Sequence, residues 1–268
     1  MTQHHGMPPE IDPSIPHPAR IYDYMLGGKD NFPADRKMAE EVFAMLPEVR
    51  SSVLQNRAFL QRAVRFLAGE AGIRQFIDIG TGIPTQGNVH EVVAPITRDA
   101  RVVYVDNDPI VHIHANALLA GDTATSILAD LREPEAILDH PETREMLDLD
   151  QPVAILIVAI LHFVPDEVKP VEIVGRLRDA MAPGSYLVLS HATGDFHPPE
   201  VKAKVARMYD RASSPMVLRS RAEVERFFDG LELVEPGLAR VSTWRPEDGS
   251  ADVDPQHSSI YAGVGRKP

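Results

Sequence analysis

The sequence predicts an α/β protein with a mostly parallel sheet and an N-terminal helical extension, and three observations support this. Residues 76–79 form a short apolar segment directly before Gly80 and Gly82, which is typical of the first strand–turn–helix unit of a nucleotide-binding sheet. A second strand-like segment, residues 101–106, ends in an acid. The most apolar segment, residues 151–160, has the composition of a central strand that is buried on both faces.

The composition limits the classes of function. The chain has 268 residues, of which 44% are hydrophobic, enough to bury one substantial core. Its formal net charge of −12 argues against nucleic acid or an anionic membrane as the main partner, because both attract basic surfaces. The chain has no cysteine, which excludes disulfides and thiolate chemistry. No signal peptide or membrane-spanning segment is evident, so we expect a cytoplasmic protein.

The chain divides into three predicted segments. Residues 1–18 contain five prolines among polar residues, which predicts a flexible arm. Residues 19–72 are expected to form a helical extension, with its two longer helices at residues 34–45 and 48–70. Residues 73–268 then make up the ligand-binding domain.

The beginning of the extension has two interpretations. A short helix is expected to end at the consecutive glycines Gly27 and Gly28, which serve either as a helix C-cap or as part of a loop. The alternative is a lid that places Tyr22, Tyr24 or Asn31 over a ligand, and Tyr22 and Gly28 are candidate cofactor contacts. Arg57, on the last helix of the extension, is either a solvated charge or a clamp for a carboxylate.

The glycine turn itself indicates which nucleotide binds. A dinucleotide fingerprint has a third glycine where this chain has Thr85. Asp78 stands two residues before the first glycine, where its carboxylate can either accept from the ammonium of an amino-acid ligand or support the loop. The predicted strand is followed by Asp78-x-Gly80-Thr81-Gly82 and then by a helix that is expected to run through about residue 93. This order of elements resembles the first motif of class I S-adenosylmethionine (SAM) methyltransferases.

Acidic residues follow the next two strands. Asp106 lies 24 residues after Gly82, the distance at which a carboxylate at the end of the second strand binds ribose hydroxyls. The alternative is that it is only a turn residue at the end of the strand. We include its neighbour Asn107 among the candidate cofactor contacts. Asp108 precedes a proline and is expected only to cap a helix. Asp130 follows the third strand and either accepts from the adenine amino group or caps a helix.

Two histidines are candidate catalytic residues. Ligands of open α/β sheets bind outside the carboxyl ends of the strands, so Ala159 and His162 are expected near the site. A helix is expected over residues 165–181. His191 is expected just past the end of a fifth strand at residues 185–190. Each histidine is either a general base or a packing residue. The spacing of histidines and acids predicts no metal site.

The sequence resembles a bacterial family named for its S-adenosyl methyltransferase domain, formerly a domain of unknown function. The resemblance covers about residues 18–266 and is carried by three blocks, residues 19–32, residues 76–91 and residues 102–109. It implies a Rossmann-like class I methyltransferase fold with a seven-stranded, mostly parallel sheet whose last strand is antiparallel. It also implies SAM contacts at Asp78, Gly80, Thr81, Gly82 and Asp106, and it favours the lid over the bare helix cap.

The sequence therefore predicts a SAM-dependent methyltransferase that acts on a small molecule. Methyl transfer depends mainly on alignment and exclusion of water, and a histidine base helps only if the acceptor must lose a proton. One alternative is a protein that binds SAM without transferring its methyl group. A nicotinamide-dependent oxidoreductase is a further alternative, which the residue at position 85 disfavours.

Overall fold

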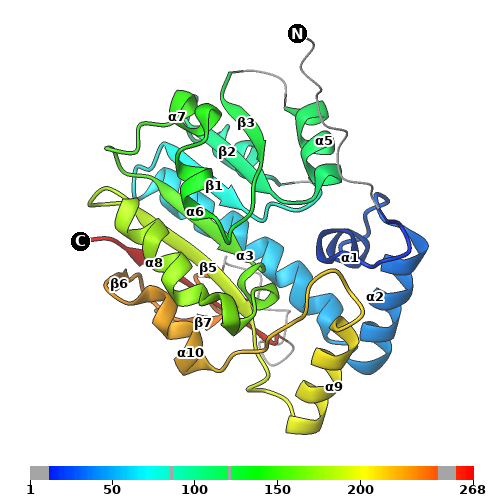
Figure 1. Cartoon of the computed structure of the whole chain (residues 1–268). Helices are drawn as coiled ribbons and strands as arrows, with labels where there is room; N and C mark the ends of the chain where they lie inside the picture. The colour runs from blue at the N-terminus through cyan, green and yellow to red at the C-terminus, as the bar shows by residue number, and fades with distance from the viewer. Residues whose placement is uncertain (1–11, 85–86, 120–121, 247–257) are drawn as a thin grey trace.

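A mixed β-sheet forms the centre of the protein (Figure 1). The structure is a computed structural model that describes residues 12–84, 87–119, 122–246 and 258–268. Strands β1 to β5 run parallel, and β8 runs antiparallel to β5. The strand order is β3–β2–β1–β4–β5–β8–β6, and β7 pairs with β8 beside this path. The strands are β1 (Gln75–Ile79), β2 (Arg101–Asp106), β3 (Ala124–Leu128), β4 (Ala154–Val158), β5 (Tyr186–Ala192), β6 (Glu232–Leu233), β7 (Ala239–Arg240) and β8 (Ile260–Arg266).

Helices cover both faces of this sheet. On one face, α3 (Val49–Gly69) and α4 (Val89–Val93) pack against side chains such as Phe76 and Val102. The other face carries the core of Ile77 and Val103 with α6, α8, α10 and the short turn η3. Neighbouring residues of one strand thus enter different cores, because side chains alternate along a strand. The remaining bounds are α5 (Pro109–Leu118), α6 (Pro134–Leu138), α7 (Pro141–Met146), α8 (Pro170–Ala180), α10 (Arg221–Glu225) and η3 (Arg226–Phe228).

A third core lies beside the sheet, where the N-terminal helices meet a helix from the other end of the chain. It joins α1 (Pro18–Met25) and α2 (Pro33–Met45) to α9 (Pro199–Tyr209) (Figure 1). Ile21, Met38, Val42, Val53 and Val205 are among its buried members. Because α3 contributes both to this core and to the core under the sheet, the N-terminal helices are anchored on the sheet through it.

The bounds of several elements agree with the sequence prediction. The helices expected at residues 34–45 and 48–70 are α2 and α3, and the short first helix ends before Gly27, whose φ is +84°. The mostly parallel sheet with an antiparallel last strand is confirmed, with the two-residue β7 added to the seven strands of the main path. Residues 1–11 of the predicted arm lie outside the described residues.

Two helix predictions are wrong. The helix expected over residues 165–181 is broken into the turn η2 (Asp166–Val168) and α8, because Lys169 between them has a φ of +56°. The helix expected directly after the glycine turn begins only at Val89, behind its N-cap Asn88. The dipole of α4 therefore does not start at the turn. Thr85, which occupies the third fingerprint position, lies outside the described residues.

The fifth strand is longer than predicted. It pairs with β8 through Ala192, opposite Ile260, so His191 lies inside the strand and not past its end. This pairing joins segments about 70 residues apart in the sequence, which local patterns cannot specify.

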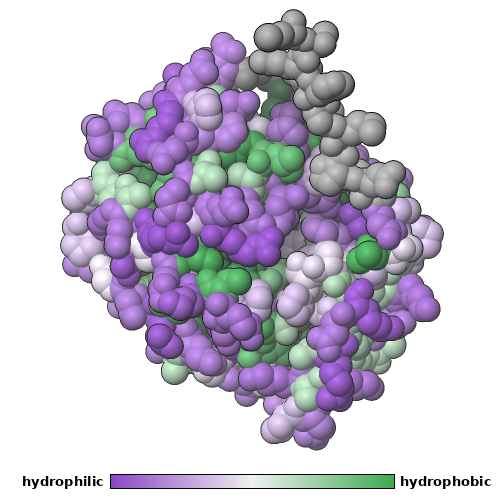
Figure 2. Space-filling model, viewed as in Figure 1, coloured by the Kyte–Doolittle hydropathy of each residue, from purple (hydrophilic) through white to green (hydrophobic). Residues whose placement is uncertain are grey.

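One face of the molecule is mainly polar. Figure 2 shows hydrophilic side chains over most of the face in view, with apolar side chains in separate small areas. Within the described ranges, no helix is both long and apolar enough to cross a membrane.

Candidate active site

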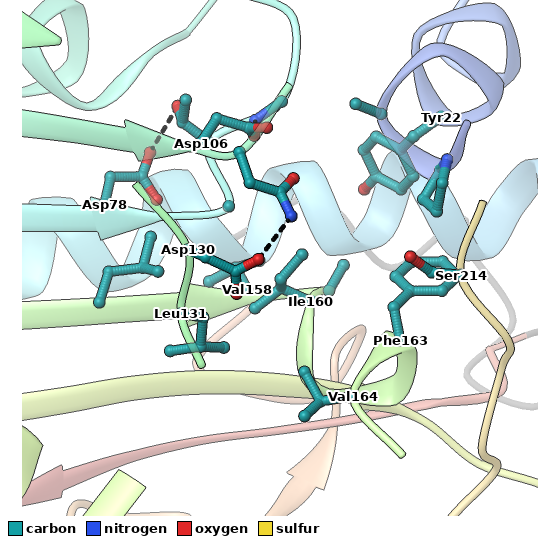
Figure 3. A pocket seen from close by; sticks show the side chains of 18 of the residues that line it. Tyr22, Asp78, Asp106, Asp130, Leu131, Val158, Ile160, Phe163, Val164 and Ser214 are labelled. Carbon is teal, nitrogen blue, oxygen red and sulfur yellow. Dashed lines mark hydrogen bonds between the residues drawn. The ribbon is translucent and has the colours of Figure 1, made fainter. Parts of the chain in front are cut away.

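A cavity of about 130 Å³ lies at the carboxyl ends of the parallel strands. Its wall combines residues after β1, β2, β3 and β4 with residues of α1 and α3 (Figure 3). The sequence-predicted residues that line it are Tyr22, Asp78, Gly80, Thr81, Gly82, Asp106, Asn107, Asp130 and Ala159. The parallel strands bring these side chains together because all their carboxyl ends meet at one edge of the sheet.

Asp78 ends up buried at the end of β1. Its Oδ2 accepts a hydrogen bond of 3.1 Å from the hydroxyl of Thr81 (Figure 3). Burial raises the pKa of Asp78 to about 6, although the charge of Arg57 and the bond from Thr81 act in the opposite direction. Arg57 also lines the cavity, and its Nη2 donates to Oδ1 of Asn88 at 2.9 Å. Arg57 is therefore held at the cavity wall, not in the solvent.

Asp106 is the corresponding carboxylate at the end of β2. Its Oδ2 accepts from the backbone N–H of Gly82 at 2.9 Å, and its Oδ1 accepts from that of Asp108 at 2.9 Å. Burial raises the pKa of Asp106 to about 6 in spite of these hydrogen bonds. The carboxylate thus holds the glycine turn of β1 against the end of β2.

Asp108 caps α5, as predicted, and has a further role in the packing. Its Oδ1 accepts from the backbone N–H of Ile110 at 2.9 Å. Its Oδ2 lies 3.1 Å from Nη1 of Arg20, whose Nε lies 3.1 Å from Oδ2 of Asp35. This buried ion-pair cluster joins α1 and α2 to the start of α5.

Asp130 and Asn107 form a hydrogen-bonded pair in the cavity wall. Nδ2 of Asn107 donates to Oδ2 of Asp130 at 3.0 Å (Figure 3). Burial acts to raise the pKa of Asp130, but the hydrogen bonds from Arg132 and Asn107 outweigh it and lower the pKa. Asp130 is therefore the carboxylate in this cavity that stays charged most readily.

Gly28 is placed elsewhere than predicted. It is not among the residues that line the cavity, and a Cβ at this position would lie 1.9 Å from Oδ1 of Asp23. Its backbone N–H donates to the carbonyl of Asp23 at 2.8 Å. Gly28 thus serves the tight packing of the turn after α1, while Tyr22 is the residue of this segment that reaches the cavity.

A second cavity of about 100 Å³ adjoins the first. It lies within the third core, between α1, α2, α3 and α9, and its wall is mainly apolar. Four residues line both cavities, namely Pro18, Tyr22, Ala159 and Phe163. Ala159 has a φ of +59°, an uncommon conformation for a residue with a side chain and one that clusters at functional sites.

His162 lines the second cavity and not the first. It lies in the turn η1 (Leu161–Phe163), and its Nδ1 accepts from the backbone N–H of Ala192 at 3.3 Å. Burial and the neighbouring His191 and Arg219 hold the pKa of His162 well below its usual value. The ring is therefore neutral with its proton on Nε2, which makes that nitrogen a hydrogen-bond donor.

His191 lines neither cavity. Its Nδ1 donates to the carbonyl of Ala192 at 2.7 Å, and its Nε2 accepts from Nη1 of Arg219 at 2.9 Å. Burial lowers its pKa to about 3. Both ring nitrogens are thus engaged in the core, so the geometry does not support the prediction that His191 acts as a base.

Sequence reasoning missed Asn56 and Arg219. Asn56 lines the first cavity, donates to the hydroxyl of Tyr22 at 2.9 Å and accepts from that of Ser190 at 2.7 Å. A polar residue within the apolar stripe of a helix was the available signal. Arg219 is buried and donates to the carbonyls of Leu161 and Val164, each at 2.8 Å. Its position in a loop carries no comparable signal.

Known proteins place the chain in a family. Residues 4–268 match the family described as S-adenosyl methyltransferase. A DUF574 family protein from Streptomyces avermitilis is 47% identical, with a TM-score of 0.92 over 97% of this chain and 100% of that chain. A candidate methyltransferase from Thermobifida fusca is 45% identical, with a TM-score of 0.88 over 95% of this chain and 96% of that chain.

More distant structures show the fold alone. Mitomycin 7-O-methyltransferase MmcR is 19% identical, with a TM-score of 0.50 over 86% of this chain and 57% of that chain. No curated protein matches the chain. The match over nearly the full length, together with the two close structural relatives, establishes that the chain belongs to the S-adenosyl methyltransferase family, whose members are SAM-dependent methyltransferases.

Proposed function

We propose that this protein transfers the methyl group of SAM to a small-molecule acceptor that binds in the second cavity. The observation that carries the proposal is the shared wall of the two cavities, formed by Pro18, Tyr22, Ala159 and Phe163. Ligands in the two cavities meet at these residues, as the donor and acceptor of a methyl group must.

The first cavity has the chemistry that SAM requires. The carboxylates at the ends of β1 and β2 can bind an ammonium and ribose hydroxyls. Leu131 and Val158 provide an apolar surface against which an adenine ring can pack (Figure 3). A Cβ at Gly82 would meet no atom within 4 Å, so the turn leaves open space beside the backbone there. Bound SAM supplies an electrophilic methyl carbon on a sulfonium.

The site residues divide by the groups they can bind. Asp78 is the candidate for the amino group of SAM, and Arg57 beside it for the carboxylate. Asp106 is the candidate for the ribose hydroxyls, because its side chain is fixed at the end of β2. Asp130 and Asn107 form the polar edge on which an adenine amino group can bind.

The N-terminal helices have a role in binding the acceptor. Tyr22 of α1 lines both cavities, and α1, α2 and α9 enclose the second cavity. We assign residues 19–72 the role of a lid that excludes water, which raises the rate of a displacement reaction by alignment and desolvation. His162 can orient the acceptor through Nε2–H, whereas the core hydrogen bonds of His191 leave it no such role.

Calorimetric titration tests the cofactor half of this proposal. SAM and S-adenosylhomocysteine (SAH) are titrated into the wild-type protein and into Asp106→Ala, with NADH as the competing cofactor. We expect both adenosyl ligands to bind, NADH not to bind, and Asp106→Ala to weaken binding by about tenfold or more, because hydrogen bonds to a carboxylate are strong. A folded protein that binds neither adenosyl ligand would contradict the proposal.

Product analysis tests the transfer half. Incubation with SAM and a library of small molecules is followed by mass spectrometry for a product that is one methyl group heavier, with Asp106→Ala as the control. Tight SAM binding without turnover of any compound across chemically diverse libraries would favour a protein that only binds SAM.

A further inference from the structure

We propose that the second cavity takes an apolar small molecule whose methylated atom is an oxygen of a carboxylate, and not an amine. This inference rests on the proposed function, since it names the acceptor class for the same site. Three features of the described wall carry it, namely its apolar surface, its charge and its hydrogen-bond donors.

The wall is built for an apolar body. Side chains from four different helices contribute, among them Ile21, Val42, Val53, Val205 and Tyr209. An apolar ligand gains free energy in proportion to the area that it removes from water there. Met25 and Met216 also line the cavity, and the flexible thioether side chain of methionine adapts to irregular shapes.

The charge of the wall disfavours a cation. Among the described residues that line the second cavity there is no aspartate or glutamate, and Lys202 of α9 is the charged side chain present. Glu48 lies behind the wall, with its Oε1 3.8 Å from Nε2 of His197. Lys202 is exposed, and its stem lies against Gly194 at the edge of the cavity. The charge of Lys202 also acts on the carboxylate of Glu223, whose pKa it helps to lower. The wall itself therefore offers a positive charge to an anionic group and no negative charge to an ammonium.

Two polar side chains of the wall, those of His162 and Tyr209, present hydrogen-bond donors. Nε2–H of His162 and the hydroxyl of Tyr209 have no hydrogen-bond partner within the described part of the chain. Tyr209 is buried, and burial raises the pKa of its hydroxyl, so it keeps its proton. Both residues line the cavity, so a ligand there can accept from these two donors. An oxygen with several lone pairs satisfies both.

The proton balance of methyl transfer agrees with these contacts. A lone pair of an anionic acceptor oxygen forms the new C–O bond while the C–S bond breaks and leaves its electron pair on sulfur, giving the methylated product and SAH without any proton transfer. An alkyl ammonium would first have to lose a proton. His162 carries its proton on the free Nε2, and His191 is engaged on both nitrogens, so neither ring is ready to take one.

Two fluorescent probes of similar size and opposite charge test the inference. 1-Naphthoate and 1-naphthylmethylammonium are titrated into the protein with SAH at saturation, and binding is followed by naphthalene fluorescence. We expect the carboxylate to bind at least about tenfold more tightly than the ammonium. Equal binding, or tighter binding of the ammonium, would overturn the inference.

A substitution that fills the second cavity tests whether the probe binds there. Met216 is half-buried in a loop and lines only the second cavity, so Met216→Trp should occlude it and abolish naphthoate binding while SAH still binds. Met146→Trp on α7 is the control, since Met146 lines neither cavity. Naphthoate binding that survives Met216→Trp in a folded protein would place the probe elsewhere and overturn the inference.

Matched pairs of variants test the two polar contacts and do not depend on filling the cavity. Lys202 and Lys204 are both exposed on α9, but only Lys202 lines the cavity. Lys202→Gln should weaken naphthoate binding by about threefold, and Lys204→Gln should not. An equal effect of the two substitutions would contradict the role of Lys202.

The second pair concerns His162. His162→Gln places an amide nitrogen near the position of Nε2, whereas His162→Asn keeps only an acceptor near Nδ1, so only the Asn variant should weaken naphthoate binding, by about fivefold. The two halves of the argument can fail separately. If SAH binds but naphthoate does not, the acceptor class is wrong, and if SAH does not bind while naphthoate does, the proposed function falls and the cavity assignment stands.

Discussion

The hydroxyl of Tyr22 accepts a hydrogen bond of 2.9 Å from Nδ2 of Asn56, and this contact joins α1 to α3 at the boundary between the two cavities. Oδ1 of Asn56 accepts from the hydroxyl of Ser190 at 2.7 Å, and Oγ of Ser190 accepts from the backbone N–H of Ala159 at 2.9 Å. The N-terminal helix is thus connected by hydrogen bonds to the end of β4, and its position depends on the conformation of that strand end.

Removal of the Tyr22 hydroxyl should destabilise the protein. Tyr22→Phe leaves the Nδ2 donor of Asn56 without its acceptor, and we expect a loss of about 1–2 kcal/mol in the free energy of unfolding. Tyr24→Phe is the control on the same helix, because the Tyr24 hydroxyl donates to the exposed carboxylate of Glu40, and its loss should stay below about 0.5 kcal/mol. Urea denaturation measures both. Equal losses would mean that the contact with Asn56 contributes no net stability.

Substitutions of Asp106 and Asp108 should have different effects, one mainly on SAH affinity and the other mainly on the free energy of unfolding. Asp108→Asn removes the charge opposite Arg20 in a buried ion pair, and we expect it to lower the free energy of unfolding by about 2–3 kcal/mol. Asp106→Asn should change stability less but weaken SAH binding by about tenfold, since it removes a carboxylate that lines the cavity. Calorimetry and urea denaturation of both variants provide the comparison. A stronger effect of Asp108→Asn than of Asp106→Asn on SAH affinity would reverse the assignment.

SAM binding should weaken in mild acid. Burial raises the pKa of Asp78 and of Asp106 to about 6 in the free protein, so both carboxyls gain protons as the pH falls through that value. Protonated carboxyls bind an ammonium or hydroxyls less well, and binding near pH ~6 should therefore release protons. Calorimetry in two buffers of different ionisation enthalpy measures the release, with pH ~8 as the control at which it should vanish. Proton uptake at pH ~6 would contradict the prediction.

The carboxyl groups of Asp78 and Asp106 should make the free energy of unfolding depend on pH in the opposite direction to SAM affinity. Their folded-state pKa values of about 6 lie above the ordinary value of 3.8. The folded state therefore binds more protons than the unfolded state between these values, so their contribution to stability grows as the pH falls and is lost as the pH rises through ~6. Bound SAM should reverse this trend, because it favours the charged carboxylates.

His191 should contribute to stability and not to cofactor binding. His191→Ala removes a fully buried ring and the acceptor of Arg219, and we expect a loss of about 3 kcal/mol in the free energy of unfolding. SAH affinity of the folded protein should be unchanged, because His191 lines neither cavity. His114→Ala, at a partly exposed position of α5, serves as the control with little effect. A lost SAH affinity with stability intact would restore a functional role for His191.

Much of the cofactor cavity could be predicted from the sequence, because it is built from local units. Asp78 and the glycines lie within eight residues at the end of one strand, and Asp106 ends the next strand along the chain. A strand followed by a tight turn is set by neighbouring residues, and parallel strands bring their carboxyl ends to one edge. Gly28 does not line this cavity, and its close approach to Asp23 is a detail of packing that a pair of glycines does not reveal.

The second cavity and the roles of the histidines were decided by tertiary structure. His162 and His191 follow or end similar apolar strands, but the pairing of β5 with β8 draws His191 into the core while His162 stays at a cavity wall. Ile21 and Val205 meet in that wall although they are far apart in the sequence. The sequence alone thus determined which residues gather at the first cavity, because they depend on short-range strand and turn geometry. Only the packing of distant segments determined the second cavity, because its wall exists only once α1, α2, α3 and α9 have come together.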